Sequence, residues 1–134
     1  KAKGAKRSVM LPVSAPFHCS LMKPAAERLR QRLADLSLSV PQISVVNNAD
    51  VACLTDPQAI KDALVRQAAS PVRWVETMQA MANQGVSHVY ECGPGKVLAG
   101  LVRRCAEGLI GGAMADLAGI EVALAATHAQ EKSC

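Results

Sequence analysis

Aromatic residues are scarce in this chain of 134 residues, which contains one Phe, one Trp and one Tyr. The core must therefore be built from aliphatic side chains and Met. Single-stranded nucleic acids are bound by stacking bases on aromatic side chains, so this composition argues against a nucleic-acid partner. No stretch offers the roughly 20 uninterrupted apolar residues of a membrane-spanning helix, and we expect no membrane partner.

Cysteine pairs at C-x-x-C spacing are also missing. The five cysteines stand at positions 19, 53, 92, 105 and 134, which is an odd number without the spacing of a zinc site. We therefore expect neither a disulfide framework nor a metal ion. Reduced thiols, and the lack of a long apolar run after the basic start, predict an untargeted cytoplasmic protein.

The balance of charge is mildly basic. Apolar residues make up 50% of the chain and charged residues 19%, which is typical of one folded domain or a piece of one. The formal net charge is +4, and its main sources are Lys1, Lys3, Lys6, Arg7, Arg28, Arg30 and Arg32. Such an excess suits an acidic carrier protein or a phosphate-bearing ligand, although a solvated helix face is the simpler explanation for most of it.

Strand and helix signals alternate along the chain. Apolar runs predict strands at 8–14, 43–46 and 86–92, and helical spacing predicts helices at 21–36, 57–68, 71–84 and 96–107. This alternation favours an α/β fold with a parallel sheet, in which functional groups follow the carboxyl ends of strands. From Gly108 onward the chain is rich in Gly and Ala, the pair Gly111-Gly112 interrupts any helix, and we expect residues 127–134 to fray.

Capping residues mark several of the helix ends. Pro24, Pro57 and Pro71 each suit a first helical turn, and Asp56 is placed to cap the helix that Pro57 begins. Gly85 is placed to end the preceding helix in the left-handed conformation.

His18 is the candidate general base. It lies in a loop between a predicted strand and a predicted helix, where an imidazole that titrates near neutrality can be both exposed and oriented. The alternative is that His18 only caps the following helix. His88, inside a predicted strand, and His128, in the predicted tail, are weaker candidates.

A nucleophile to match this base is absent from the sequence. No serine has glycines two residues before and after it, so the Gly-x-Ser-x-Gly elbow is missing. Cys19 adjoins His18, but adjacent side chains diverge in extended chain, so a small packing role suits Cys19 better. If the protein is a Ser-His enzyme, its serine lies elsewhere.

Two further motifs bear on anion binding. The segment Gly93-Pro94-Gly95-Lys96 lies between a strand and a helix, as phosphate loops do, but it has neither P-loop nor dinucleotide spacing, so a structural turn is the favoured interpretation. Arg66 and Arg73 flank Gln67 and have the chemistry to hold a carboxylate, although surface arginines seldom do so.

Ordered blocks of this sequence resemble the C-terminal part of the malonyl-CoA:acyl carrier protein transacylase family. The blocks cover 4–14, 15–22, 45–51, 64–67 with 71–74, and 85–101, and they include Pro16-Phe17-His18-Cys19, Asn47-Asn48, Val65-Arg66-Gln67 and Gly93-Pro94-Gly95-Lys96. The resemblance therefore extends over most of the chain.

The resemblance implies an acyltransferase of fatty acid biosynthesis. A serine takes the malonyl group from coenzyme A and passes it to acyl carrier protein in a ping-pong reaction, with no cofactor beyond the coenzyme A thioester itself. His18 matches the family's general base, and Gln67 matches the residue whose backbone carbonyl orients that base. Phe17, beside the base, corresponds to a position that goes with malonyl rather than branched substrates, although plain core packing is an equal alternative for this side chain.

The resemblance also implies a larger fold. Residues 15–134 would form the C-terminal part of an α/β-hydrolase-like subdomain, and residues 1–14 the last strand of a small ferredoxin-like subdomain. The nucleophilic serine, the carboxylate-binding arginine and the oxyanion loop are expected upstream of Lys1, so the chain alone is expected to be inactive. Two alternatives stay open: an acyltransferase domain of a polyketide or fatty acid synthase, and a noncatalytic module that docks a carrier protein.

Overall fold

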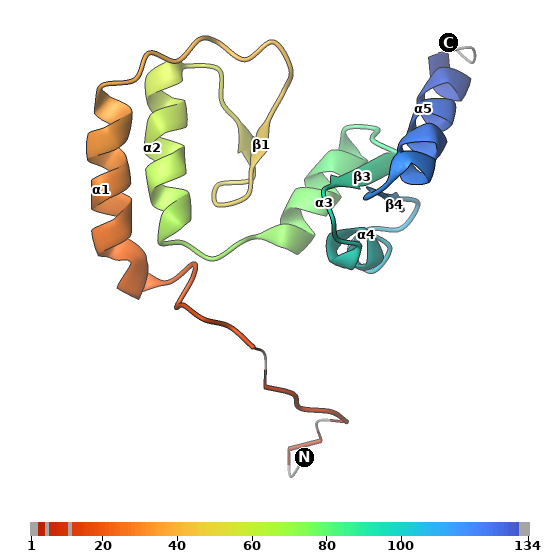
Figure 1. Ribbon diagram of the computed structural model, residues 1–134, viewed down its shortest axis with the longest axis horizontal. Helices are drawn as coiled ribbons and strands as arrows, with labels where there is room; N and C mark the ends of the chain where they lie inside the picture. Colours follow the sequence, from red (N-terminus) through yellow and green to blue (C-terminus); the bar gives the residue numbers. More distant parts are fainter. Residues whose placement is uncertain (1–2, 5, 11, 132–134) are drawn as a thin grey trace. The chain divides into compact units, whose positions relative to one another are not determined.

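The computed structural model describes residues 3–4, 6–10 and 12–131 (Figure 1). The chain divides into two compact units. Unit 1 comprises Lys1–Ala49 and Leu54–Val72, and unit 2 comprises Asp50–Cys53 and Arg73–Cys134. Both contain helices and strands, which confirms the predicted α/β class at that level.

Unit 1 is built on two helices that lie side by side (Figure 1). Its elements are the 3₁₀ helix η1 (Ser20–Met22), α1 (Lys23–Ala34), the short strand β1 (Val46–Asn47) and α2 (Pro57–Ala68). Ala26 and Leu33 of α1 pack against Val65 of α2, and Leu29, Ala68 and Ala69 surround this cluster. The buried contact fixes α2 against α1.

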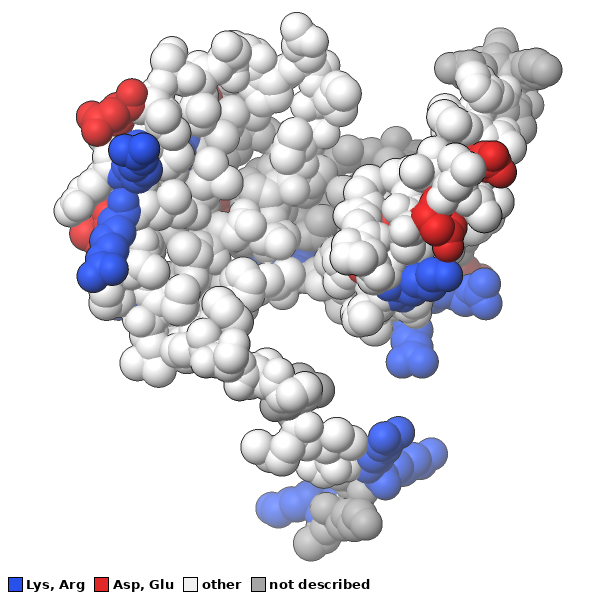
Figure 2. All heavy atoms as spheres, in the orientation of Figure 1, with Lys and Arg blue, Asp and Glu red and all other residues white. Residues whose placement is uncertain are grey.

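Capping and surface charge support the same helix pair. Asp56 caps α2 as predicted, because its Oδ2 accepts a hydrogen bond from the Ala59 N–H at 2.8 Å. Arg30 of α1 lies 3.4 Å from Glu27 and 3.7 Å from Asp62 of α2, and charges of both signs cover α1 in Figure 2. These side chains are about half exposed, so such pairs contribute at most about 1 kcal/mol each.

Unit 2 contains a parallel strand pair with helices around it. Its elements are β2 (Ala52–Cys53), α3 (Trp74–Asn83), β3 (His88–Cys92), α4 (Val97–Val102), β4 (Ile110–Met114) and α5 (Leu117–Glu131). β3 and β4 pair in parallel from His88↔Ile110 to Cys92↔Met114, with α4 in the connection. A parallel arrangement with a helix in the connection is therefore confirmed, although the sequence did not predict β4. The core of this unit is Met78, Val102 and Leu109.

Glycine lets α4 and Tyr90 approach β4 closely. A Cβ on Gly111 would overlap the backbone carbonyl oxygen of Ala99 in α4 and lie 3.1 Å from the Val102 Cβ. A Cβ on Gly112 would lie 2.6 Å from the Tyr90 ring. The sequence predicts that this glycine pair interrupts any helix, and no helix includes it. The pair instead lies in a strand, where only glycine leaves enough room for the neighbours.

The predicted fraying of residues 127–134 is wrong for the part of this segment that the structure describes. Helix α5 continues through Thr127 to Glu131, because it packs against β4, where Gly119 closely approaches the Ala113 carbonyl. The expectation for residues 132–134, including Cys134, lies outside the described residues. Among the helices that the structure describes, none is long and apolar enough to cross a membrane.

The N-terminal strand prediction is wrong for the residues that the structure describes. Residues 8–10 and 12–14 form no strand, and Leu11 lies outside the described residues. Met10 and Val13 are exposed by 93% and 72%. A strand needs a neighbour to satisfy its backbone hydrogen bonds, and no described residue pairs with this segment.

Other boundaries differ from the sequence prediction in detail. The strand predicted at 43–46 is confined to Val46–Asn47, α3 begins at Trp74 rather than Pro71, and α4 ends at Val102 rather than residue 107. The Pro71 signal is misleading because that proline lies in the connection between α2 and α3. Gly85 follows α3 with a φ of +85°, as predicted.

We predict opposite stability effects for two Gly→Ala substitutions in unit 2. Gly111→Ala forces a Cβ into the α4 backbone and lowers the free energy of unfolding by about 1–3 kcal/mol. Gly100→Ala, within α4, meets nothing within 4 Å and raises it by about 0.5–1 kcal/mol. Urea denaturation of both variants checks the pair, and equal effects would contradict the packing described.

Candidate active site

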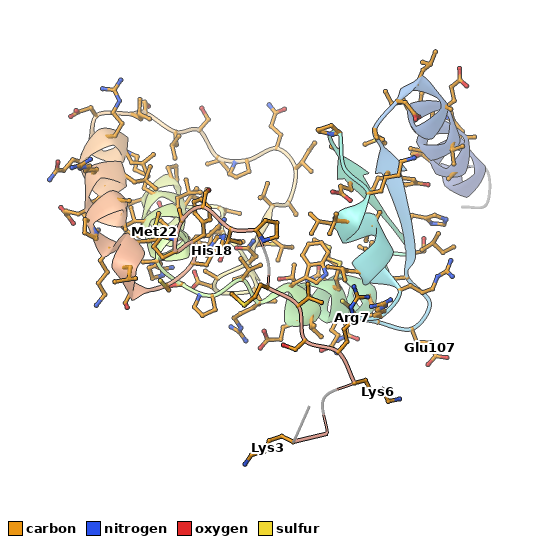
Figure 3. The ribbon with its side chains drawn as sticks, turned by 60° about the horizontal axis from the view of Figure 1, so that its bottom comes forward. Lys3, Lys6, Arg7, His18, Met22 and Glu107 are labelled. Atoms are coloured by element: carbon orange, nitrogen blue, oxygen red, sulfur yellow. The ribbon has the colours of Figure 1, made fainter. Side chains whose placement is uncertain are left out.

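His18 occupies the loop that leads into η1 and α1 (Figure 3). Its backbone is left-handed, with a φ of +57°, and its side chain is exposed. Histidine tolerates this conformation better than most residues other than glycine. The imidazole Nδ1 lies 3.3 Å from the backbone carbonyl oxygen of Gln67, so the structure brings these two predicted site residues together.

This contact determines what the ring can do. A carbonyl oxygen only accepts hydrogen bonds, so Nδ1 must carry the proton and donate it to Gln67. The neutral ring then has its lone pair on Nε2, where it can accept a proton from a bound hydroxyl or thiol. The ring is thereby set up as a general base, oriented by a carbonyl dipole instead of a carboxylate.

The Gln67 carbonyl is available because of the residue four positions later. In a continuing helix it would accept the N–H of residue 71, but Pro71 has none. Helix α2 ends at Ala68, and the N–H groups near the Gln67 oxygen are those of Ala69 and, at 3.4 Å, Ser70, which are not the donor of a regular helical turn. Proline four residues after the glutamine is the sequence signal that indicates a carbonyl without its helical donor.

Short-range hydrogen bonds hold the loop around His18. The Phe17 N–H donates to the Ala15 carbonyl at 2.9 Å, and the Cys19 thiol donates to the Pro16 carbonyl at 3.2 Å. No side chain caps η1 or α1, so His18 does not serve as a helix cap. Phe17 is 59% exposed, so it is not part of the core that the described residues form.

The weaker candidates are occupied by structural contacts. The His88 Nδ1 lies 2.9 Å from the Ser87 hydroxyl, and the ring stacks on Tyr90 with the centroids 6.2 Å apart. At the turn 93–96, the carboxylate of Glu91 accepts the Ala99 N–H at 2.9 Å and so occupies the start of α4. This contact favours a structural turn over a phosphate loop. Within the described part of the chain, no group of three His, Cys, Asp or Glu side chains could hold a metal ion.

Arg73 already holds a carboxylate of its own chain. Its Nε and Nη2 donate to the two carboxylate oxygens of Glu76 at 3.0 and 2.8 Å. These hydrogen bonds raise the pKa of Arg73 and lower the pKa of the Glu76 carboxyl from their ordinary values. The guanidinium fork is therefore occupied, and Arg73 is a poor candidate for binding a substrate carboxylate.

Comparison with known proteins gives close relatives over most of the chain. This chain is 52% identical over 124 residues to the malonyl CoA-acyl carrier protein transacylase of Salmonella typhimurium. The match covers 92% of this chain and 40% of that protein. The protein of the same name from Bacillus subtilis is 40% identical over 124 residues, covering 92% of this chain and 39% of that protein. No protein-family model matches the chain.

Solved structures agree with the sequence relatives. The acyl-carrier-protein S-malonyltransferase of Burkholderia pseudomallei is 61% identical with a TM-score of 0.85, covering 92% of this chain and 40% of that one. A malonyl-transacylase in complex with its type II PKS acyl-carrier protein is 47% identical with a TM-score of 0.86, at the same coverages.

The relatives thus define a class of acyl-transferring enzymes, the S-malonyltransferases. This chain is homologous to malonyl CoA-acyl carrier protein transacylases, and the predicted resemblance is confirmed. The chain spans about 40% of the length of these relatives.

We predict that the backbone of Gln67, and not its side chain, orients His18. Gln67→Ala keeps the carbonyl and leaves the His18 tautomer unchanged, whereas Ala68→Pro distorts the last turn of α2, at a cost of about 3 kcal/mol to a helix interior, and disrupts the contact. Nitrogen-15 NMR of the imidazole reports which nitrogen carries the proton. Loss of the Nδ1–H tautomer in Gln67→Ala would assign the role to the side chain.

Proposed function

We propose that this chain supplies the general base of a malonyl-CoA:acyl carrier protein acyltransferase. The observation that carries this proposal is the 3.3 Å contact between His18 Nδ1 and the Gln67 carbonyl, which leaves Nε2 as the proton acceptor. The names of the relatives supply the reaction: transfer of a malonyl group between coenzyme A and acyl carrier protein.

The reaction has two matched halves. His18 Nε2 takes the proton from a serine hydroxyl as its oxygen attacks the thioester carbonyl of malonyl-CoA. The carbon–sulfur bond then breaks, the imidazolium returns the proton to the departing thiolate, and a malonyl-serine ester remains. In the second half, His18 deprotonates the carrier protein thiol, whose sulfur attacks the ester carbonyl. The carbon–oxygen bond to serine then breaks, and the imidazolium returns the proton to the departing serine oxygen. The Gln67 carbonyl stabilises the imidazolium in both halves.

The serine must come from outside these 134 residues, because the sequence has no Gly-x-Ser-x-Gly elbow. This chain spans 40% of its relatives, so an acyltransferase needs further protein around it. We call this chain together with the segment that supplies the serine the intact protein. The reaction takes place only in the intact protein.

The wider architecture follows from the same proposal. In the intact protein, residues 15–134 form the C-terminal part of an α/β-hydrolase-like subdomain, and residues 1–14 gain the neighbour that they need to become a strand of a ferredoxin-like subdomain. The exposed side chains of Met10 and Val13 support that pairing, because an added sheet would cover them. The enzyme needs no cofactor and works in the cytoplasm, in agreement with the free thiols of Cys19, Cys53, Cys92 and Cys105.

A role in polyketide synthesis is the second candidate. One solved relative is the malonyl-transacylase bound to a type II PKS acyl-carrier protein, at 47% identity. That candidate uses the same base and the same acyl group and differs in the carrier protein. Malonyl transfer to carrier proteins of the two kinds separates the candidates, and a noncatalytic docking module would form no malonyl-serine with either.

We predict that His18→Ala lowers malonyl transfer in the intact protein by roughly 10²- to 10⁴-fold, the usual contribution of a general base. Stability should change little, because the ring is exposed and makes one hydrogen bond. The transfer rate from malonyl-CoA to carrier protein measures the effect, and circular dichroism confirms folding. His88→Ala is the matched control, and near-normal turnover of His18→Ala would reject His18 as the base.

We predict that Phe17 contributes to the choice of acyl group. An exposed phenyl ring beside the base can fill the space that a methyl group on the substrate's α-carbon requires, and one methyl group is worth about 1–3 kcal/mol of discrimination. Phe17→Ser should therefore relax the preference for malonyl over methylmalonyl thioester. The ratio of kcat/KM for the two substrates measures this, and an unchanged ratio would show that Phe17 does not contact the acyl group.

A further inference from the structure

The orientation of His18 depends on which N–H groups reach the carbonyl oxygen of Gln67. The imidazole Nδ1 lies 3.3 Å from this oxygen, which has two lone pairs and only accepts hydrogen bonds. In a regular α-helix, the N–H of the residue four positions later donates to such an oxygen. For Gln67 that residue is number 71, so the amino acid at this position determines whether the helix or the imidazole supplies the main donor.

The N–H groups that follow Gln67 most closely along the chain are poorly placed to donate to its oxygen. The Ala69 backbone has left the helical conformation, with φ −117° and ψ 10°, and its N–H is shared between the carbonyls of Arg66, at 3.1 Å, and Gln67. The Ser70 N–H lies 3.4 Å from the Gln67 oxygen, which is longer than the usual N–H···O distance. The oxygen therefore keeps the capacity to accept a further hydrogen bond.

Residue 71 is proline and supplies no N–H. Its ring also disfavours the helical conformation of the preceding residue, Ser70, so α2 does not continue through it. Pro71 is exposed and belongs to neither of the two core clusters that the described residues form. Packing therefore does not account for this proline. Its missing N–H, by contrast, is the helical donor that would compete with His18 Nδ1 for the Gln67 oxygen.

We propose that Pro71 is a positioning residue for His18: by withholding the helical N–H from the Gln67 carbonyl, it leaves that oxygen to Nδ1–H and keeps Nε2 free to accept a proton. The inference rests on the proposed function, because the tautomer matters to the reaction only if Nε2 takes the proton of the serine. Pro71 touches no substrate in this role and acts through Gln67 and the ring. An N–H at position 71 would take the carbonyl for the helix and release the proton from Nδ1.

The alternative is that Pro71 matters only through its ring, which ends α2. The two explanations differ in chemistry, because an α-hydroxy acid at position 71 forms an ester bond that has neither an N–H nor a proline ring. Lactic acid is the α-hydroxy counterpart of alanine. The variants Pro71→Ala and Pro71→lactic acid therefore have the same side chain and differ only in the backbone group that follows the Ser70 carbonyl, which is an N–H in one and an oxygen in the other.

Nitrogen-15 NMR of the His18 ring in the intact protein tests the tautomer. We expect Pro71→Ala to move part of the proton population from Nδ1 to Nε2, and Pro71→lactic acid to keep the Nδ1–H tautomer of the unsubstituted protein. Pro57→Ala is the matched control, because Pro57 is the first residue of α2, where an N–H has no helical acceptor. An unchanged tautomer in Pro71→Ala, or the same loss of Nδ1–H in both position-71 variants, would overturn the proposal.

The rate of malonyl-serine formation tests the consequence for the reaction. Pro71→Ala should lower kcat about tenfold, the usual effect of losing one hydrogen bond, with little change in the KM for malonyl-CoA, because the proposal gives Pro71 no contact with the substrate. Pro71→lactic acid should restore most of the rate, and Pro57→Ala should leave it unchanged. A slow rate that the ester does not relieve, or equal slowing by Pro57→Ala, would contradict the role of the missing N–H.

The two experiments separate this inference from the proposed function. If Pro71→Ala moves the proton to Nε2 but His18→Ala transfers malonyl at a normal rate, the role of Pro71 stands and the proposed base is wrong. If His18→Ala is slow but Pro71→Ala keeps both the tautomer and the rate of the unsubstituted protein, the base stands and the role of Pro71 is wrong. Should Pro71→Ala fail to fold, the ester variant decides, because loss of its Nδ1–H tautomer would overturn the proposal and its retention would support it.

Discussion

The contact between His18 Nδ1 and the Gln67 carbonyl is the interaction on which the function of this chain depends. It joins two residues that are 49 positions apart, a loop before α1 and the end of α2. The packing of Ala26 and Leu33 against Val65 fixes the two helices to each other. The aliphatic core of unit 1 therefore keeps His18 beside the Gln67 carbonyl that orients its ring.

Backbone chemistry replaces the acidic partner of a conventional triad. A carbonyl dipole fixes the same tautomer that a carboxylate would, without placing a full negative charge beside the ring. Pro71 makes this possible because it leaves the Gln67 oxygen without its helical donor. A proline that ends a helix thus also prepares a catalytic acceptor.

The sequence predicted the helices of unit 1 and the parallel character of unit 2 better than it predicted the irregular segments. Pro24, Asp56 with Pro57, and Gly85 are local signals with a local physical cause, and the structure uses each of them. The strand β4 was missed, because its glycines weaken strand propensity and are explained only by their contacts with Ala99 and Tyr90. The strand predicted at residues 8–14 is absent for the opposite reason. The apolar residues there are typical of a strand, but a strand also needs a neighbour to pair with, and the local sequence does not specify one.

The candidate site was predictable as far as its residue types and their resemblance to a family allowed. His18, Gln67 and Phe17 came from those motifs, while the left-handed backbone of His18 is a three-dimensional fact without a sequence signature. Arg73 shows the reverse case, in which a plausible anion-binding residue is already paired with Glu76.

Chemical rescue is the most direct test that His18 acts as the proton acceptor. The rate of a single malonyl transfer is measured for the His18→Ala intact protein with increasing free imidazole. If the missing group is a base beside the Gln67 carbonyl, imidazole restores part of the rate in proportion to its concentration, and it leaves the unsubstituted protein unaffected. A rate that does not respond to imidazole, in a protein that still folds and binds malonyl-CoA, would contradict the account.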